Sequence, residues 1–404
     1  MAPTNSFSAA DSANGYLYQV RVGLLWSIRR LRVGSEFQVS IETLDDVTFE
    51  DKHGAPLELL QTKHHKNREA SLTDASPDLW KTLRIWFEGR IGGQILAGTA
   101  LHLLTTGVAS AGSAASHLRV ADRNVEAALT LLEITAQSSN SVTNAPAYQV
   151  FSKTPRSERK QLLESVTVLD RAPDTTNLTD ALRQEVFWAV GRDHLDAFLD
   201  RLEGWWVRRV VAQLAAIASA DRILSAEVEA EMSLLREQFK EESLPIDDDL
   251  LAFELDETTR NNHTGSNFVR QLELAEAGKK RIAAAIRDYY RAFEQRSRWL
   301  RDELLLVGDL SRYERRLVQE WELVFEAMRD DIGAAAADDA KKRAARDVLK
   351  WAERATIPIR ANVTEPFITR GSLHMLADGF HVGWHPDFRD KLARVLGAEE
   401  SGVT

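Results

Sequence analysis

Two adjacent acidic residues and a nearby glutamine–lysine pair are the side chains in this chain that best suit catalysis. Asp45 and Asp46 come first, and Gln61 and Lys63 follow after a short turn. A carboxylate and an amide offer hard oxygen ligands to a cation such as Mg²⁺, which keeps several of its waters. An ammonium beside them can orient an attacking water or stabilise developing negative charge. This combination suits metal-dependent hydrolysis of a phosphodiester.

The local sequence predicts that these residues lie on a β-hairpin. The runs Val39–Phe49 and Leu57–Lys63 are rich in β-branched and apolar residues, and a turn with glycine and proline separates them. Alternate side chains of a strand share a face, so Leu59, Gln61 and Lys63 should point the same way. An ammonium is rare on a face that leads into the core unless it is paired or functional.

Asp46 and Gln61 are the predicted metal ligands, and Asp45 is the alternative carboxylate. The full set of candidate catalytic residues is Asp46, Gln61, Lys63, Asp45, Glu42 and Gln19. The neutral amide of Gln61 binds a cation more weakly than a carboxylate does. The alternative for the same residues is a surface hairpin in which Asp46 and Lys63 form a salt bridge.

A basic cluster follows the hairpin directly. It consists of His64, His65, Lys66 and Arg68, at the predicted mouth of the site. Such clusters attract backbone phosphates without reading base sequence, so we expect a nucleic-acid-binding surface here. A metal role for the two histidines is disfavoured, because adjacent residues on a strand point in opposite directions.

The order of elements around the hairpin predicts an α/β (α+β) domain over residues 1–203. A helix over Ala13–Arg32 precedes the hairpin, and a second helix over Pro77–Gly89 follows it. Thr99–Thr106 has the composition of a buried strand. A mixed sheet flanked by helices satisfies this order.

A mainly α-helical domain is predicted over residues 204–404. From Trp205 onward, strand patterns almost vanish and long amphipathic helices appear. The arginines of the helix predicted over Asn267–Leu306 are interpreted as a solvated face rather than a DNA track. The stretch Glu241–Glu257 holds eight acidic residues and no Lys or Arg. We expect a solvated loop there, or alternatively a strip that lies over the basic cluster.

Three histidines, His374, His381 and His385, lie close together near the end of the sequence. Their spacing does not match a common zinc motif. The neighbouring aromatic residues Trp384, Phe380 and Phe388, with Pro386, are instead interpreted as a docking surface for a partner.

Composition limits the class of protein. The chain has 404 residues, no cysteine and a formal net charge of −10. Disulfides and thiolate sites are therefore excluded, and any contact with nucleic acid must be local. No apolar run reaches the ~18 residues of a membrane span, and the N-terminus lacks signal-peptide features. We expect a cytoplasmic protein without a membrane segment.

The hairpin resembles the PD-(D/E)xK nuclease superfamily in its variant with Q-x-K in place of E-x-K. Asp46 matches the acidic residue, and Gln61-Thr62-Lys63 match Q-x-K. The flanking sequence resembles the nuclease domain of anti-phage effectors, in the segments GYLYQ, LDDV, QTKHH and SLTDASPDLWKTLRIW. The closing GSLHMLADGFHVGWHPDF is similar to the C-terminal domain of effectors in Lamassu-type, or ABC-three-component, defence systems.

The resemblance implies an Mg²⁺- or Mn²⁺-dependent endonuclease that cuts double-stranded DNA and is kept inactive until triggered. It places Gln19 beside the active site, in the YQ motif of the first helix. It implies an SMC-like ABC ATPase and a small third subunit as partners. One site cuts one strand, so we expect a homo-oligomer in the active state. The alternatives are a non-catalytic DNA-binding scaffold subunit and an RNase.

Overall fold

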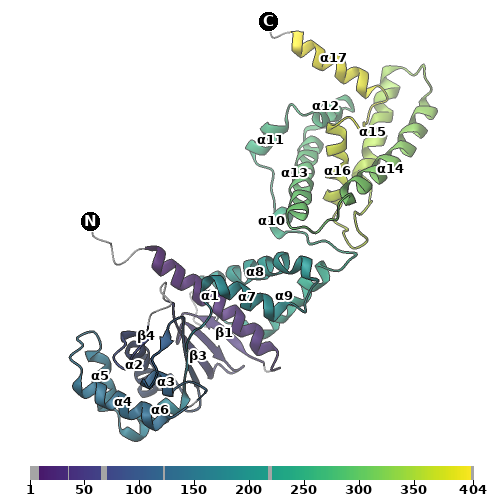
Figure 1. Ribbon diagram of the computed structural model, residues 1–404. Helices are drawn as coiled ribbons and strands as arrows, with labels where there is room; N and C mark the ends of the chain where they lie inside the picture. Colours follow the sequence, from purple (N-terminus) through teal and green to yellow (C-terminus); the bar gives the residue numbers. More distant parts are fainter. Residues whose placement is uncertain (1–8, 35, 65–70, 122, 217–220, 402–404) are drawn as a thin grey trace. The chain divides into compact units, whose positions relative to one another are not determined.

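The computed structural model describes residues 9–34, 36–64, 71–121, 123–216 and 221–401 (Figure 1). It divides the chain into two compact units, Met1–Leu235 and Arg236–Thr404. The N-terminal unit contains a mixed sheet with helices, and the C-terminal unit is helical. The predicted fold class is thus confirmed.

Eight strands lie in the described part of the N-terminal unit. They are β1 (Gln38–Ile41), β2 (Val47–Glu50), β3 (Pro56–Lys63), β4 (Ser71–Leu72), β5 (Ala100–Thr105), β6 (Val108–Ala109), β7 (Val166–Leu169) and β8 (Ile223–Leu224). The main sheet has six strands in the order β7-β5-β3-β2-β1-β8. Strands β1, β2 and β3 form an antiparallel meander, and β3, β5 and β7 are parallel. Strands β4 and β6 form a separate parallel pair.

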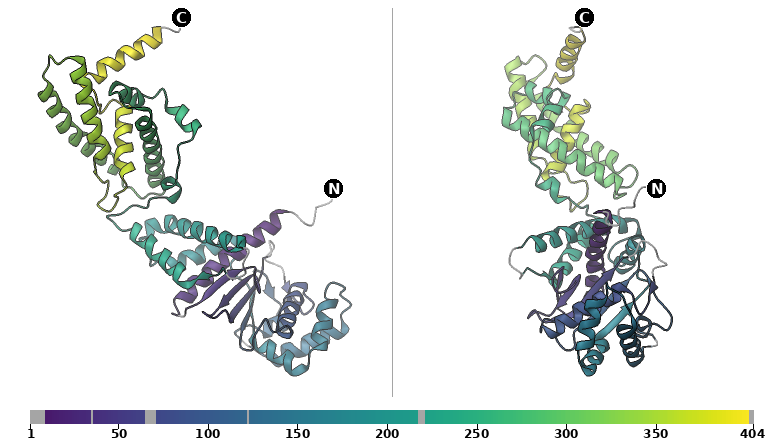
Figure 2. Two further views of the ribbon diagram at one scale, coloured as in Figure 1. Left: turned by 180° about the vertical axis from the view of Figure 1, so that it is seen from behind. Right: turned by 90° about the vertical axis from the view of Figure 1, so that its left-hand side faces the viewer.

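Helices cover both faces of the main sheet (Figures 1 and 2). The described helices of this unit are α1 (Ala9–Leu31), α2 (Pro77–Ile91), α3 (Ala114–His117), α4 (Val125–Ser138), α5 (Ala145–Lys153), α6 (Arg156–Ser165), α7 (Thr175–Val186), the 3-10 helix η1 (Arg192–His194), α8 (Leu195–Ala215) and α9 (Ser225–Gln238). Helices α2, α4, α5 and α6 share a buried core with Leu59 of β3 and Leu101 of β5. Helices α1 and α8 pack on β1 from the other face.

The predicted hairpin is present as β2 and β3, but its first strand is shorter than expected. Val39–Phe49 is not one strand, because the turn Glu42–Asp46 separates β1 from β2. The amide of Glu42 donates to the Asp46 carbonyl at 3.1 Å, and that of Thr43 donates to the Asp45 carbonyl at 3.3 Å. Glu42 has a φ of 56°, which few non-glycine residues adopt. The two carboxylates are therefore carried by a tight turn rather than by a strand.

Helix α8 completes the N-terminal unit. Trp206 is buried, and its indole donates to the Val20 carbonyl of α1 at 2.7 Å. The side-chain amide of Gln213 accepts from Ile41 N at 3.0 Å and donates to Ile41 O at 3.2 Å. Gln213 thereby satisfies the backbone N–H and C=O of Ile41, as a neighbouring strand would. The predicted boundary near residue 203 falls inside this helix, and the structure moves it to Leu235.

The close approach of α1 to this layer depends on Gly23. A Cβ atom added there would lie 2.9 Å from Ile41 Cδ1 and 3.3 Å from Trp206 Cζ2. Such distances are below ordinary van der Waals contact, so a side chain would push α1 away from β1 and α8.

The helices of the C-terminal unit are α10 (Asp248–Leu251), α11 (Glu257–His263), α12 (Asn267–Leu274), α13 (Lys279–Arg301), α14 (Asp309–Ile332), α15 (Asp338–Arg354), α16 (Pro366–Asp378) and α17 (Phe388–Ser401). Helices α13 and α16 cross closely at Gly371, where a Cβ would collide with the Asp288 carbonyl oxygen. No helix in the described residues is long and apolar enough to cross a membrane.

The acidic stretch Glu241–Glu257 packs on α13 through its apolar residues, while seven of its eight acidic residues are exposed, so the expected solvation holds for the charges but the segment is not a free loop. Trp299 donates from its indole to the Pro245 carbonyl at 2.7 Å, and Phe253 stacks on Tyr290 at 4.5 Å between ring centroids. Arg298 pairs with Asp249 at 2.7 Å and with Asp247 at 3.3 Å. Two of the eight carboxylates thus already have a cationic partner inside the C-terminal unit.

The histidine and aromatic cluster near the C-terminus belongs to the core. Trp384, Phe388, His374 and His385 are all buried, so the interpretation of these aromatics as a docking surface is wrong. Burial lowers the pKa of His374 to about 3, so its imidazole is neutral. Within the described ranges, no group of three or more His, Cys, Asp or Glu side chains is arranged to hold a metal.

The role of α8 predicts where the chain can be cut. A fragment of residues 1–238 should unfold cooperatively, because it retains every contact of the N-terminal unit. A fragment of residues 1–203 should not, because it loses Trp206, Gln213 and β8. Thermal unfolding followed by circular dichroism compares the two. An equal melting temperature for both fragments would show that α8 is dispensable.

Candidate active site

The meander brings the predicted carboxylates to the end of β3. In the pairing of β2 with β3, Val47 lies opposite Leu60, so Asp46 comes next to Gln61 and Thr62. Strand β3 is held on its other side by parallel pairing with β5, in which Lys63 lies opposite Thr105. The turn before β2 and the end of β3 are thus fixed next to each other in a continuous sheet.

Asp46 is held in a single orientation by Thr62. Its Oδ2 accepts hydrogen bonds from the Thr62 amide at 2.7 Å and from the Thr62 hydroxyl at 2.8 Å. None of the described residues donates a hydrogen bond to Oδ1. Asp46 is 9% exposed, so Oδ1 remains as the oxygen that could bind a cation at the site.

The side chain of Asp45 points into the core beside α2. Its Oδ2 accepts from the indole of Trp86 at 2.7 Å, and its Oδ1 accepts from the Asp46 amide at 2.9 Å. Asp45 is 8% exposed. Burial raises the pKa of its carboxyl to about 7, although the hydrogen bond from Trp86 opposes this shift. The nearby charge of Asp46 raises the pKa further.

Glu42 and Gln19 approach the same site from the turn and from α1. Partial burial raises the pKa of the Glu42 carboxyl, and the Asp46 charge raises it further. A hydrogen bond from the Gln19 side chain and the charge of Lys63 lower it. Gln19, Asp46 and Lys63 therefore all influence the ionisation of Glu42.

Gln61 and Lys63 complete the site on β3. Gln61 is 5% exposed, and its amide makes no hydrogen bond with another described residue. Burial lowers the pKa of the Lys63 ammonium, while Asp46 and Asp78 raise it and Lys81 lowers it. A half-buried ammonium beside Asp46 and an amide without a protein partner are suited to a ligand between them.

The predicted basic cluster is described only at His64. Its Nε2 lies 3.2 Å from the Thr175 hydroxyl, and its ring packs on Tyr18 with 5.0 Å between centroids. His64 is therefore held between α1 and α7. His65, Lys66 and Arg68 lie outside the described residues.

Sequence reasoning missed three residues at this site. Thr62 lies between Gln61 and Lys63 on the strand, and Trp86 lies in the helix predicted over Pro77–Gly89. Tyr16 of α1 has a buried hydroxyl without a hydrogen-bond partner in the described residues, and its pKa is raised by burial and by Glu42. The spacing of Tyr16 and Gln19, one helical turn apart, was the available signal.

The donor set fits a hard divalent cation. Mg²⁺ needs only one or two carboxylates, because it keeps several of its waters. Asp46 Oδ1 and the Gln61 amide oxygen are available, with Glu42 nearby as a further carboxylate. No thiolate exists in the chain. The imidazole of His64, next to Lys63, contacts Thr175 and Tyr18. A soft or borderline metal would therefore find few of its preferred ligands.

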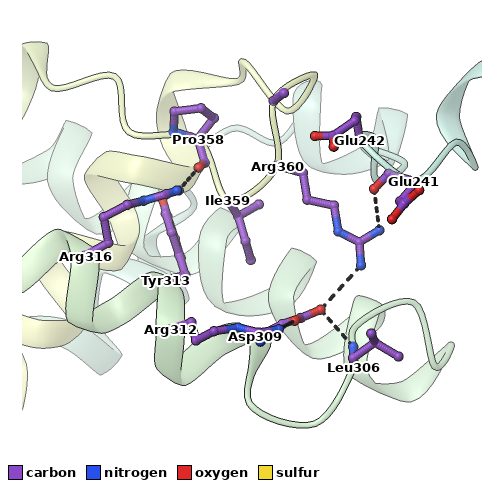
Figure 3. A pocket seen from close by; sticks show the side chains of 11 residues that line it. Glu241, Glu242, Leu306, Asp309, Arg312, Tyr313, Arg316, Pro358, Ile359 and Arg360 are labelled. Atoms are coloured by element: carbon purple, nitrogen blue, oxygen red, sulfur yellow. Dashed lines mark hydrogen bonds and ion pairs between the residues drawn. The ribbon is translucent and has the colours of Figure 1, made fainter.

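The C-terminal unit has a separate polar cavity of about 570 Å³ beside the start of α14 (Figure 3). Its arginines are engaged within the chain. Arg360 donates to the Glu241 carbonyl at 3.1 Å and pairs with Asp309 at 3.4 Å, and Arg316 donates to the Pro358 carbonyl. We assign no chemistry to this cavity.

Comparison with known proteins bears on the C-terminal unit. Residues 268–392 match the family model described as C-terminal domain 7 of the ABC-three component (ABC-3C) systems. The match places this protein in ABC-three-component systems. The matched domain points to partner subunits and to an effector role in a multi-component defence system. No curated protein matches the chain.

The buried carboxyl of Asp45 should make the stability of the N-terminal unit depend on pH. Its pKa is about 7 when folded, against 3.8 for an unperturbed group. The folded state therefore binds the proton more tightly. This contribution to stability is complete below pH ~4 and is lost as pH rises through ~7. Asp45→Asn removes the titration, so its Tm relative to the wild type should rise between pH ~5 and ~8.

The expected change is on the order of 10 °C. The shift from 3.8 to about 7 spans ~3 pKa units at about 1.4 kcal/mol each, and the Tm of a domain of this size moves by ~2–4 °C per kcal/mol. Asp51→Asn is the control. Asp51 is exposed at the β2–β3 turn, and backbone hydrogen bonds lower its pKa, so its titration lies below this window. Parallel pH curves for Asp45→Asn and the wild type would contradict the assignment.

Proposed function

We propose that the N-terminal unit is a metal-dependent DNA endonuclease, the effector activity of a Lamassu-type anti-phage complex. The observation that supports this most is the convergence of Asp46, Gln61 and Lys63 at one edge of the sheet, with Asp46 oriented by Thr62. Their sequence pattern resembles the Q-x-K variant of the PD-(D/E)xK superfamily. The C-terminal match supplies the defence context.

Asp46 Oδ1 and the Gln61 amide oxygen would hold Mg²⁺ or Mn²⁺, with Glu42 beside them. The bound cation supplies the polarisation of a phosphoryl oxygen and a water of lowered pKa. Lys63 would orient that water or stabilise negative charge on the phosphate. Partial burial and the Asp46 charge raise the pKa of Glu42, so this carboxylate would be the proton acceptor beside the site.

Double-stranded DNA is the proposed substrate, bound without sequence specificity. The net charge of −10 confines phosphate contacts to a local surface, so affinity should fall steeply with salt. Since one site cuts one strand, double-strand cleavage would require two copies of the chain. The neutral amide of Gln61 favours the second candidate, a non-catalytic DNA-binding scaffold, because it weakens metal binding.

The decisive experiment is cleavage of plasmid DNA with Mg²⁺, with and without the partner ATPase. Lys63→Ala and Asp46→Ala should each lower cleavage by ~100-fold or more, because each removes a group that acts on the reacting phosphate. Asp45→Ala should be milder. The Tm of Lys63→Ala should hardly change, since burial already disfavours the charged ammonium.

Lys52→Ala is the matched control, since Lys52 is exposed at the far end of the same hairpin. It should cleave like the wild type. Cleavage by Lys63→Ala with ordinary Mg²⁺ dependence would refute the assigned role of Lys63. A wild type that binds DNA but never cuts it would favour the scaffold, and one that cuts only RNA would make it an RNase.

The C-terminal unit is proposed to hold this nuclease on an SMC-like ABC ATPase, together with a small third subunit. The match to an ABC-3C C-terminal domain covers this unit, which supports the assignment. The full chain should co-purify with the ATPase, and the fragment of residues 1–238 should not. Capture of the ATPase by that fragment would transfer the docking role to the N-terminal unit.

A further inference from the structure

Four residues form a continuous chain of hydrogen bonds around the predicted metal ligand. Trp86 of α2 donates to Asp45 Oδ2 at 2.7 Å, and the Asp46 amide donates to Asp45 Oδ1 at 2.9 Å. On the other side, Thr62 donates twice to Asp46 Oδ2. Asp46 is thus held through its backbone from α2 and through its side chain from β3.

Asp45 is poorly placed to be a second metal ligand. One of its oxygens faces Trp86, which is fully buried in the core shared with Leu59 and Leu101. The other faces the backbone of its own turn. Both oxygens are therefore turned away from open space at the site. Its adjacency to Asp46 in sequence does not place the two carboxylates on one cation.

We propose that Asp45, Trp86 and Thr62 form a clamp that fixes Asp46 with Oδ1 toward the cation, and that Asp45 and Trp86 are positioning residues rather than ligands. The inference rests on the proposed metal-dependent function and deepens it. It also resolves which of the two adjacent aspartates binds the metal.

The energetic pattern supports a functional role for the clamp. Burying the Asp45 carboxyl beside the charge of Asp46 is unfavourable, and the hydrogen bonds from Trp86 and the Asp46 amide offset part of that cost. The turn also holds Glu42 at a left-handed φ, a second local cost. Unfavourable burial and backbone strain at one turn are typical of functional sites, where the geometry of the side chains matters more than stability. Groups that orient a metal ligand commonly change metal affinity by about 10–100-fold when removed.

The test measures Mn²⁺ binding to the full-length protein by electron paramagnetic resonance, in parallel with cleavage. Trp86→Phe and Thr62→Val should each weaken Mn²⁺ binding by about 10-fold or more. Thr62→Ser keeps the hydroxyl and should bind like the wild type. Asp46→Ala should abolish binding.

Matched controls separate the clamp from general damage to the core. Trp80 lies on the same helix, is fully buried, and donates its indole to the Asp74 carbonyl at 2.6 Å. Thr82 is a buried threonine of α2 whose hydroxyl has no partner in the described residues. Trp80→Phe and Thr82→Val should leave the Mn²⁺ affinity unchanged.

A double-mutant cycle distinguishes positioning from direct ligation. If Asp45 acts through its link with Trp86, Asp45→Asn combined with Trp86→Phe should bind Mn²⁺ no more weakly than the weaker single variant. If Asp45 is a ligand, Asp45→Asn should be as severe as Asp46→Asn and Trp86→Phe should be mild. That second pattern would overturn the proposal.

The outcomes also separate this inference from the proposed function. Mn²⁺ binding that is unchanged in Thr62→Val and Trp86→Phe would refute the clamp and leave the nuclease proposal standing. A wild type that binds no Mn²⁺ would refute the nuclease proposal, and with it the clamp. If Trp86→Phe does not fold, the pair Thr62→Val and Thr62→Ser decides the question.

Discussion

The pair of hydrogen bonds from Thr62 to Asp46 is the interaction on which the N-terminal site depends. It joins a tight turn to the end of a strand that is paired on both sides. A carboxylate on a free turn would sample several rotamers and would bind a cation in few of them. Anchored on β3, Asp46 acquires the rigidity of the sheet. Gln61 and Lys63 flank Thr62 in sequence, so the same strand positions three of the participating residues.

The site also depends on a helix far along the chain. Ile41 ends β1 immediately before the turn, and both of its backbone polar groups are satisfied by Gln213 of α8. Without that amide, the strand edge next to the turn would present unpaired groups to solvent. The packing of Gly23 against Ile41 and Trp206 joins α1, β1 and α8 into one layer. This is the physical reason why the N-terminal unit extends past residue 203.

The spacing of apolar residues, with a period of two residues in strands and 3.6 in helices, was enough to predict the hairpin and the change to a helical unit. The strand period also predicted that Gln61 and Lys63 share a face. These periods could not reveal the turn at Glu42–Asp46, because its flanks have the composition of a continuous strand. The bond from Trp86 to Asp45 depends on how α2 packs, which local sequence does not encode. The packing of the acidic stretch was missed for a related reason. Composition reports its charge but not its pairing with Arg298.

Several arginines of α13 form ion pairs with carboxylates of the C-terminal unit. Arg296 is buried and paired with Glu314, Arg281 pairs with Glu353 at 2.8 Å, and Arg298 holds the acidic stretch. Cations committed to carboxylates in this way have little attraction left for phosphate, since binding DNA would first require breaking those pairs. The helix that most resembled a DNA track is instead part of the scaffold of the C-terminal unit. Nucleic acid contacts are then better sought around the N-terminal site, and the C-terminal unit remains available for partner subunits.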